Sequence, residues 1–128
     1  MKTIEVITQK RDELVDITPL VQTAVEDLGI LDGHVTLYVP HTTCGLTISE
    51  NVDPDVAADL LASLESAIPW SWSAYKHRGG NSAAHIKSSI VGVSLTVLVE
   101  GGDVKLGVWQ GIFLCEFDGP RTRQIWVG

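Results

Sequence analysis

The chain has 128 residues, 45% of them hydrophobic and 20% charged, which excludes a disordered or low-complexity protein and supplies enough apolar side chains for a core. We therefore expect one domain over residues 1–128. Sixteen acidic residues against nine basic ones give a formal net charge of -7. Because no dense basic cluster offsets this charge, neither nucleic acid nor an anionic membrane surface is an expected partner.

The beginning of the chain and its cysteines bear on location. The first residues alternate like a strand and do not resemble a signal peptide, and the longest apolar runs are too short to cross a bilayer. Cys44 and Cys115 are too few for a disulfide scaffold, although one disulfide between them stays open. We expect a cytoplasmic protein with two free thiols.

The first half of the chain alternates strand and helix signals. Two alternating segments, 3–8 and 13–17, flank a charged turn and predict a hairpin. Thr18 followed by Pro19 predicts a helix start, and an apolar stripe carries that helix to residue 28, where Gly29 can end it. Strands are expected at 35–39 and 44–50, and a second helix after Asp53-Pro54.

The second half begins with an irregular stretch. Between residues 66 and 84 the periodicity fails, yet the stretch is rich in aromatic residues, so we expect an ordered and functional loop. Residues 85–91 fit a short helix or a strand equally well. A hairpin is expected from 93–99 and 104–108, followed by strands at 112–117 and 124–127. About eight short strands and two helices predict an antiparallel sheet or sandwich with helices packed on it.

Three of the four histidines lie where ligands are usually presented. His41, His77 and His85 fall in loops or at element ends, whereas His34 precedes a strand and has the character of a surface residue. Three imidazoles with one open position would make a catalytic zinc site. The spacing between His77 and His85 matches no zinc signature, so ordinary polar loop histidines are the competing interpretation.

Charged residues on apolar strand faces are the next candidates. Glu50 and Glu116 each share a strand face with apolar side chains, which requires a salt bridge, a functional role or a position where the strand end opens to water. Arg121 and Arg123 would share one strand face and could either clamp a phosphate or carboxylate, or pair with acidic side chains. For Cys44 we favour packing over catalysis, because a nucleophile would need a depressed pKa.

Several blocks of the sequence resemble the YjbQ-like family, also called the secondary thiamine-phosphate synthase family. The blocks are His41-Thr42-Thr43-Cys44-Gly45-Leu46-Thr47-Ile48-Ser49-Glu50-Asn51 with Asp53-Pro54, then Tyr75-Lys76-His77 with Asn81-Ser82-Ala83-Ala84-His85-Ile86-Lys87, and finally Gly107-Val108-Trp109-Gln110 with Glu116-Phe117-Asp118-Gly119-Pro120-Arg121-Thr122-Arg123. One departure is Arg78-Gly79-Gly80, where the family often has an acidic residue before Gly-Asn.

The resemblance implies a fold and an assembly. It implies an α+β fold, an antiparallel β-sandwich of jelly-roll-like type with two to three short helices, assembled as a homotrimer. It also implies a cleft near a subunit boundary, with zinc or another divalent metal on three histidines. Glu50, Asn51 and Arg121 would be the catalytic residues. The substrate would contact Thr42, Thr43, Asn81 and Arg123, and the metal would be held by His41, His77 and His85.

The function implied is that of a small enzyme acting on a phosphorylated metabolite. The reaction is low-level thiamine-phosphate synthesis, in which a pyrimidine diphosphate and a thiazole phosphate give thiamine phosphate and pyrophosphate. A metal-assisted hydrolase would use the same parts. Two other interpretations stay open: a trimeric protein that binds a phosphorylated or carboxylated metabolite without turnover, and polar residues that only hold the trimer together.

Overall fold

The computed structural model describes all of residues 1–128. Three helices and eight strands follow one another along the chain in the order β1 (Lys2–Ile7), β2 (Glu13–Asp16), α1 (Thr18–Leu28), β3 (Gly33–Tyr38), β4 (Cys44–Glu50), α2 (Pro54–Ala67), α3 (Ser82–Val91), β5 (Ser94–Glu100), β6 (Asp103–Val104), β7 (Gln110–Glu116) and β8 (Thr122–Val127). The helices have 11, 14 and 10 residues, and none combines the length and apolarity of a bilayer-crossing segment.

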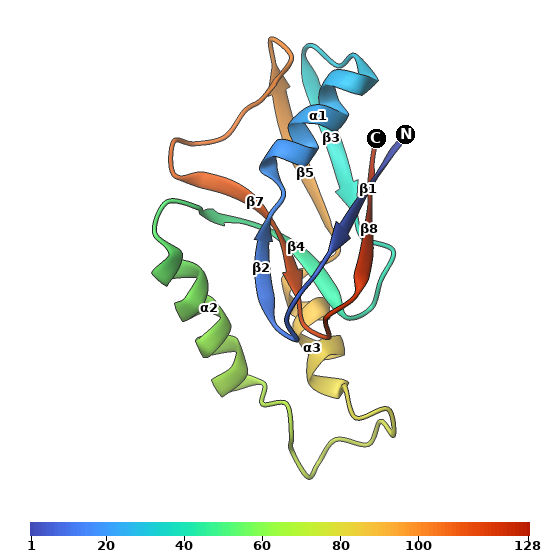
Figure 1. The fold of residues 1–128 in the computed structure, drawn as a ribbon, viewed down its shortest axis with the longest axis vertical. Helices are drawn as coiled ribbons and strands as arrows, with labels where there is room; N and C mark the ends of the chain where they lie inside the picture. Colours follow the sequence, from blue (N-terminus) through green and yellow to red (C-terminus); the bar gives the residue numbers. More distant parts are fainter.

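The strands form two curled antiparallel sheets. The larger sheet has the order β1-β8-β3-β5-β6, and the smaller has the order β2-β7-β4. Figure 1 shows the two sheets side by side, with α2 and α3 beyond the smaller one. This is an α+β fold of half-barrel shape with three helices, as expected in class; the strand orders do not establish a jelly-roll-like sandwich.

The hairpin expected at the start of the chain is absent. β1 pairs with β8, whereas β2 pairs with β7, so the two segments belong to different sheets. Alternating polarity identifies a strand but not its neighbour. The polar residues between the two strands carry the chain from one sheet to the other, and for that reason the hairpin prediction is wrong.

Local signals place the helices well. α1 ends at Gly29, whose φ of 69° is the left-handed conformation that glycine adopts without strain. Its first turn differs in detail, because the Asp16 carboxylate accepts hydrogen bonds from the amide and the hydroxyl of Thr18 at 2.9 and 2.7 Å. Asp53 caps α2 through the amide of Asp55, as its position before Pro54 indicated. The ambiguous stretch 85–91 belongs to α3.

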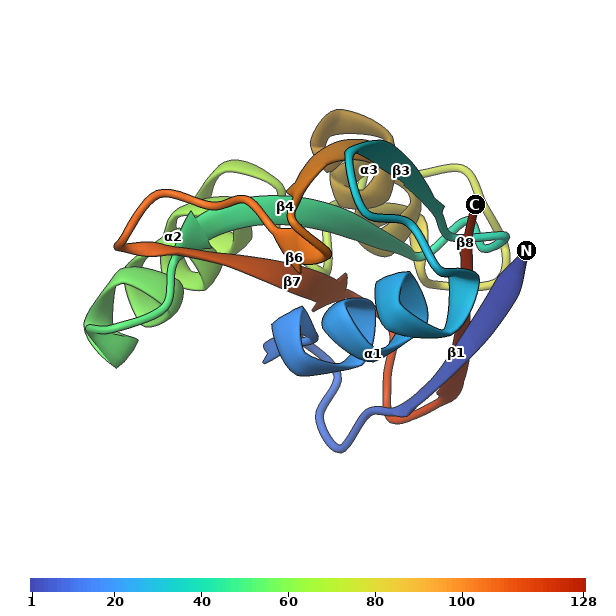
Figure 2. The same ribbon diagram turned by 90° about the horizontal axis from the view of Figure 1, so that it is seen from above.

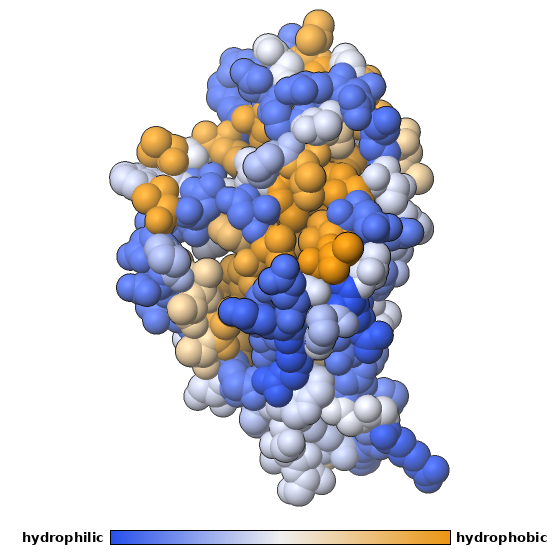
Figure 3. Space-filling view, in the orientation of Figure 1, coloured by the Kyte–Doolittle hydropathy of each residue, from blue (hydrophilic) through white to orange (hydrophobic).

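The main core lies between the two sheets, where α1 closes one end of the space (Figure 2). It consists of alternate side chains of both sheets together with Ile17, Val21 and Val25. A smaller cluster of Ala84, Cys115 and Phe117 packs between the other face of the smaller sheet and α2 and α3. Figure 3 shows that some apolar surface also remains at the centre of one face, where β1, β2 and α1 meet.

A four-membered ion network fastens the two outer helices to the rest of the chain. The Lys87 ammonium is 1% exposed and lies 2.7 Å from the Glu65 carboxylate and 3.6 Å from that of Asp12. Arg11 reaches both carboxylates and stacks over the ring of Trp70 at 4.4 Å. Since α2 has no fully buried residue, this network and the half-buried leucines Leu61 and Leu64 hold it in place.

Candidate functional site

A polar cleft of about 350 Å³ opens at the end of the smaller sheet, beside the first turn of α3. None of its nine lining residues is hydrophobic. Four segments that are distant in the sequence meet there: the loop between β3 and β4, the start of α3, the loop between β7 and β8, and β8 itself. The lining residues are Pro40, His41, Thr42, Thr43, Asn81, His85, Asp118, Arg121 and Arg123. The fold thus brings together seven of the ten predicted site residues.

The floor of the cleft is a buried ion pair. Arg123 donates to both carboxylate oxygens of Glu116, from Nε at 2.9 Å and from Nη2 at 2.5 Å, and the two side chains are 4% and 0% exposed. Nη2 also donates to the hydroxyl and the carbonyl of Thr43 at 2.8 and 3.2 Å. The carboxylate further accepts the Thr8 hydroxyl and the amides of Phe117 and Asp118. Of the alternatives open for Glu116, the structure selects the salt bridge.

This pair holds its charges firmly. Burial is the largest single influence and lowers the pKa of Arg123, but the hydrogen bond with Glu116 and the nearby negative charges together outweigh burial, so the net pKa lies above the ordinary value. Removal of two ions from water costs roughly several kcal/mol per ion. Their mutual attraction and hydrogen bonds offset this cost only when the geometry is good. The buried ion pair, with all its hydrogen bonds made, therefore adds little net stability to the fold. Its presence indicates a site whose geometry must stay fixed.

The two arginines do not share one face as the sequence suggested. Arg121 precedes β8, and its side chain is 53% exposed, whereas Arg123 is buried within the strand. Arg121 donates from Nε to the Asp118 carbonyl at 2.8 Å and from Nη2 to the Asp118 carboxylate at 3.1 Å. Its position at the rim, with the remaining N–H groups unused by the protein, leaves it able to reach an anion in the cleft.

His41 is held in a defined orientation at one wall. Its Nε2 accepts a hydrogen bond from the Gln124 amide at 2.9 Å, so that nitrogen carries no proton. The pKa of His41 is lowered from 6.5, first by burial and then by the positive charge of Arg123. The result is a neutral imidazole that carries its proton on Nδ1, where it can donate to a ligand.

Asn81 and Asp118 link the opposite wall to the loop after β7. Asn81 lies at the N-cap position of α3 and donates from Nδ2 to the Asp118 carboxylate at 2.9 Å. Its Oδ1 is buried and has no hydrogen-bond partner in the protein. An unsatisfied buried acceptor of this kind is unusual and indicates a position where a donor group of a ligand could form a hydrogen bond.

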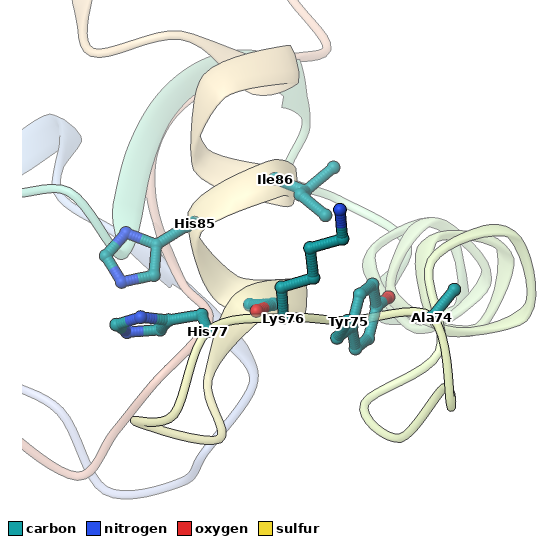
Figure 4. A pocket seen from close by; sticks show the side chains of 7 residues that line it. Ala74, Tyr75, Lys76, His77, His85 and Ile86 are labelled. Carbon is teal, nitrogen blue, oxygen red and sulfur yellow. The ribbon is translucent and has the colours of Figure 1, made fainter.

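His77 and His85 form an edge-to-face pair at the mouth of the cleft. Their ring centroids are 5.3 Å apart with an interplanar angle of 87°, and both rings point to the same side of α3 (Figure 4). Gly79 makes room for this arrangement, because a Cβ at that position would lie 2.7 Å from His77 Nε2 and 3.1 Å from Asn81 Oδ1. His85 lines the cleft itself, while His77 lies outside it.

The three histidines do not form a metal site in this arrangement. No group of three or more histidine, cysteine, aspartate or glutamate side chains in the chain is placed to hold a metal ion. His77 and His85 are neighbours, but Nε2 of His41 is engaged with the backbone of β8. The donor set therefore does not fit a three-histidine zinc centre as the chain stands.

Glu50 and Asn51 lie far from the cleft. In register, Cys44 at the start of β4 pairs with Glu116, whereas Glu50 at its end pairs with Gln110. Six residue steps of about 3.3 Å separate the two ends, roughly 20 Å. Asn51 instead donates to the Asp16 carboxylate at 3.2 Å. Within one chain, the fold does not bring these two predicted residues to the histidines.

The cysteines are structural. Both are buried and free, and burial raises the pKa of Cys44 to about 11 and that of Cys115 to about 12. Thiols with raised pKa values are poor nucleophiles, so the preference for packing at Cys44 agrees with its surroundings.

Sequence reasoning missed two polar residues of the site. Asp118 binds both Asn81 and Arg121, and Thr8 completes the hydrogen bonds of the Glu116 carboxylate. Asp118 precedes Gly119-Pro120 and has the sequence context of an ordinary turn residue. Thr8 lies 108 positions from Glu116, and no local pattern could have connected them.

Comparison with known proteins gives a consistent result. The family model described as "UPF0047 protein YjbQ-like" matches residues 2–128. The UPF0047 protein YugU of Bacillus subtilis is 50% identical over 127 residues, covering 99% of this chain and 96% of that protein. A UPF0047 protein of Methanocaldococcus jannaschii is 50% identical over 123 residues, covering 96% and 88%.

Solved structures agree in fold. A crystal structure of a YjbQ/UPF0047 family protein from Clostridium acetobutylicum superimposes with a TM-score of 0.96 at 46% identity, over 100% of this chain and 98% of that one. A conserved hypothetical protein from Thermus thermophilus gives 0.94 at 46% identity with the same coverage. By sequence, by fold and by the blocks that build the cleft, this chain belongs to the YjbQ-like UPF0047 family.

Proposed function

We propose that the protein is an enzyme that binds the phosphate group of a small metabolite in the polar cleft and acts on it with histidine acid–base chemistry. The observation that carries the proposal is the cleft's composition: eight of its nine lining residues are polar or charged, and they are built on a buried Glu116–Arg123 pair. Catalytic sites are where such rigid, costly polar arrangements are kept.

Phosphate binding rests on the donors at the rim. Arg123 is committed to Glu116, so Arg121 is the cation that can turn toward a ligand, with the exposed hydroxyl of Thr42 beside it. The N-terminus of α3 adds a partial positive charge near the same place. Thr43 supports the ligand indirectly, since its hydroxyl and carbonyl hold Arg123.

Proton transfer falls to His41 and His85. His41 is neutral and holds its proton on Nδ1, which can act as a donor or acid, while His85 stands across the cleft without a side-chain hydrogen-bond partner in the protein. A substrate between them would meet one imidazole on each side. Loss of a positioned acid or base lowers turnover by roughly 10²–10⁴-fold.

The reaction to test first is the one that the family resemblance implies, thiamine-phosphate synthesis. A coupled assay measures the release of pyrophosphate. Hydrolysis of small phosphate esters is tested in parallel, with the released phosphate as the measured product. We expect turnover that His85→Ala and Arg121→Gln abolish, with His34→Ala as the matched control because His34 is an exposed histidine at the distant end of β3. If saturable binding occurs without any product, the alternative of a metabolite-binding protein replaces the enzyme.

Assembly as a homotrimer is part of the proposal, because Glu50 and Asn51 require it if they act. They lie at a tip of the fold where Val52, Val108 and Trp109 are 57%, 85% and 60% exposed. Exposed apolar groups of this density are typical of protein–protein contacts. A neighbouring copy that buries this tip could carry Glu50 and Asn51 to the cleft.

A mixing experiment separates the two possibilities. His85→Ala and Glu50→Gln proteins, each inactive alone, are unfolded together, refolded and assayed. Recovery of activity shows that one site uses residues of two copies, whereas no recovery, with a trimeric mass confirmed by sedimentation, shows that no site combines His85 of one copy with Glu50 of another. Two free, buried thiols support a reducing compartment such as the cytoplasm.

Zinc or another divalent metal stays a prediction from the resemblance. Elemental analysis of the purified wild type, His85→Ala and His34→Ala proteins tests it directly. Near-stoichiometric zinc that only His85→Ala loses would mean that His41 gives up its hydrogen bond to Gln124 on binding metal. Absence of metal from all three, after purification without chelators and addition of zinc, leaves the histidines as acid–base groups.

A further inference from the structure

The charges around the cleft cancel one another. Its two cations are Arg121 and Arg123. Its two anions are Asp118 in the lining and Glu116 in the floor. Burial lowers the pKa of His41, so that imidazole stays neutral. A phosphate monoester brings about 1.5–2 negative charges at neutral pH, and a cleft without net charge compensates them only in part. A phosphate that carries its own positive charge fits this cleft better than one that does not.

One carboxylate oxygen of Asp118 is left for a ligand. Oδ2 accepts both hydrogen bonds that the side chain receives, from Asn81 Nδ2 at 2.9 Å and from Arg121 Nη2 at 3.1 Å. Oδ1 accepts none, and it is not one of the buried polar atoms that lack a partner. Because the side chain is 13% exposed and lines the cleft, Oδ1 is the atom through which its charge reaches a ligand. With Oδ1 of Asn81, this wall has two oxygen acceptors that no group of the chain satisfies.

The backbone at Asp118 and Arg121 is held in place by the floor of the cleft. The amide of Asp118 donates to Glu116 Oε2 at 3.1 Å, and the amide of Arg121 donates to the Thr8 hydroxyl at 2.8 Å. Thr8 and Glu116 are in turn joined by a hydrogen bond of 2.7 Å. Groups on a fixed backbone lose less conformational freedom when a ligand binds. Asp118 and Arg121 thus present one charge of each sign at defined positions in one cleft.

We propose that the cleft binds a zwitterion, an aliphatic phosphate monoester whose ammonium group contacts Asp118 and whose phosphate contacts Arg121. The phosphate half of this statement rests on the proposed function, and the ammonium half rests on Asp118. An ammonium group fits because its charge and its three N–H donors give a stronger hydrogen bond to Oδ1 than a hydroxyl can. The linker between the two groups is short, since Asp118 and Arg121 are in direct contact and no hydrophobic residue lines the cleft.

Two probes of equal size test the ammonium half: phosphoethanolamine, and n-propyl phosphate, in which a methyl group replaces the ammonium group. Calorimetry at neutral pH measures their affinities, and the NMR signals of the Asp118 amide and the Arg121 side chain locate the binding. We expect phosphoethanolamine to bind at least about tenfold more tightly, which is the effect of one hydrogen bond to a charged group. Inorganic phosphate, the third probe, tests the phosphate half alone.

Asp118→Asn keeps the size of the side chain and removes its charge. The cleft then has a net positive charge, so n-propyl phosphate and inorganic phosphate should bind about three- to tenfold more tightly. Phosphoethanolamine loses its partner and should gain nothing, so the preference for it should disappear. General damage to the site would instead weaken all three probes. Asp59→Asn is the matched control, because it makes the same change of net charge at an exposed position of α2.

The outcomes distinguish this proposal from the proposed function. If n-propyl phosphate binds to the wild type as tightly as phosphoethanolamine, Asp118 holds no ammonium group, although the phosphate cleft stands. If no phosphate binds but ethylammonium shifts the Asp118 signals, the cation site stands and the phosphate cleft fails. If Asp118→Asn changes the affinity of all three probes by the same factor, Asp118 acts only through Arg121, and the ammonium assignment is overturned. If no probe binds, both proposals are overturned.

Discussion

The buried floor of the cleft makes a sharp prediction about stability. Glu116→Gln keeps the shape of the side chain but removes its charge, which leaves the Arg123 guanidinium buried without a counter-charge. Loss of one member of a buried pair costs about 3–5 kcal/mol in the free energy of unfolding. At about 2.1 cal/mol/K per residue, a chain of 128 residues has an unfolding entropy near 0.27 kcal/mol/K, so Tm should fall by roughly 11–19 °C.

The assay is urea and thermal unfolding at one fixed protein concentration, followed by circular dichroism. Arg121→Gln is the control, because the pair of Arg121 with Asp118 lies at the surface and should be worth less than about 1 kcal/mol. The double variant Glu116→Leu/Arg123→Met should recover most of the stability, since it leaves no unpaired charge. If Glu116→Gln lowers Tm no more than Arg121→Gln does, the buried pair is not the rigid floor of the cleft.

Three further changes should have distinct effects. Gly79→Ala should displace the His77 ring, seen as altered imidazole signals in NMR, and lower turnover by roughly 10- to 100-fold. Lys87→Met should cost about 1–2 kcal/mol in urea unfolding, less than a fully buried pair because Glu65 is partly exposed. Burial raises the pKa of Glu65, but the hydrogen bonds from Lys87 and the Trp70 amide, with the charges of Lys87 and Arg11, together outweigh burial, so the net pKa lies below 4.5. The stability that this shift contributes is complete above pH 4.5, is lost as pH falls through the lower folded pKa, and should shrink in Lys87→Met. The pKa of His41 is lowered from 6.5, so its neutral form should favour folding above pH 6.5 and stability should decline as pH drops below that value, a slope that His41→Gln should remove. A flat Tm between pH 7 and 5 in the wild type would contradict the last of these.

Signals confined to a few residues were the reliable ones. Pro54 and Gly29 mark helix ends because their backbone restrictions act locally, and both helices begin or end where these residues predict. Pairing of strands was not predictable in the same way. β1 finds its partner at β8, across the whole chain, and nothing in residues 2–7 encodes that choice.

The same division holds for the cleft. His41 was identified from its place at an element end, Arg121 from an expected strand face, and Asn81 from the family resemblance, and the fold brings all three together. The burial of Arg123 was missed, because Thr122 and Gln124 on either side of it are also polar. The sequence therefore does not show which face of β8 turns inward. Glu50 lies at the end of β4, and the first residue of β4, Cys44, lies beside the cleft. Only the length of the strand shows that Glu50 is roughly 20 Å from that end.

The pairing of β1 with β8 has a consequence for biosynthesis. Lys2 is opposite Val127, and β8 is the strand that joins β1 to the rest of its sheet. Until residues 122–127 leave the ribosome, β1 has no partner, and Ile4 and Val6 cannot be buried against Ile125 and its neighbours. Folding of the larger sheet therefore has a high contact order, and until β8 has been synthesised β1 is an unpaired edge that is open to wrong pairing.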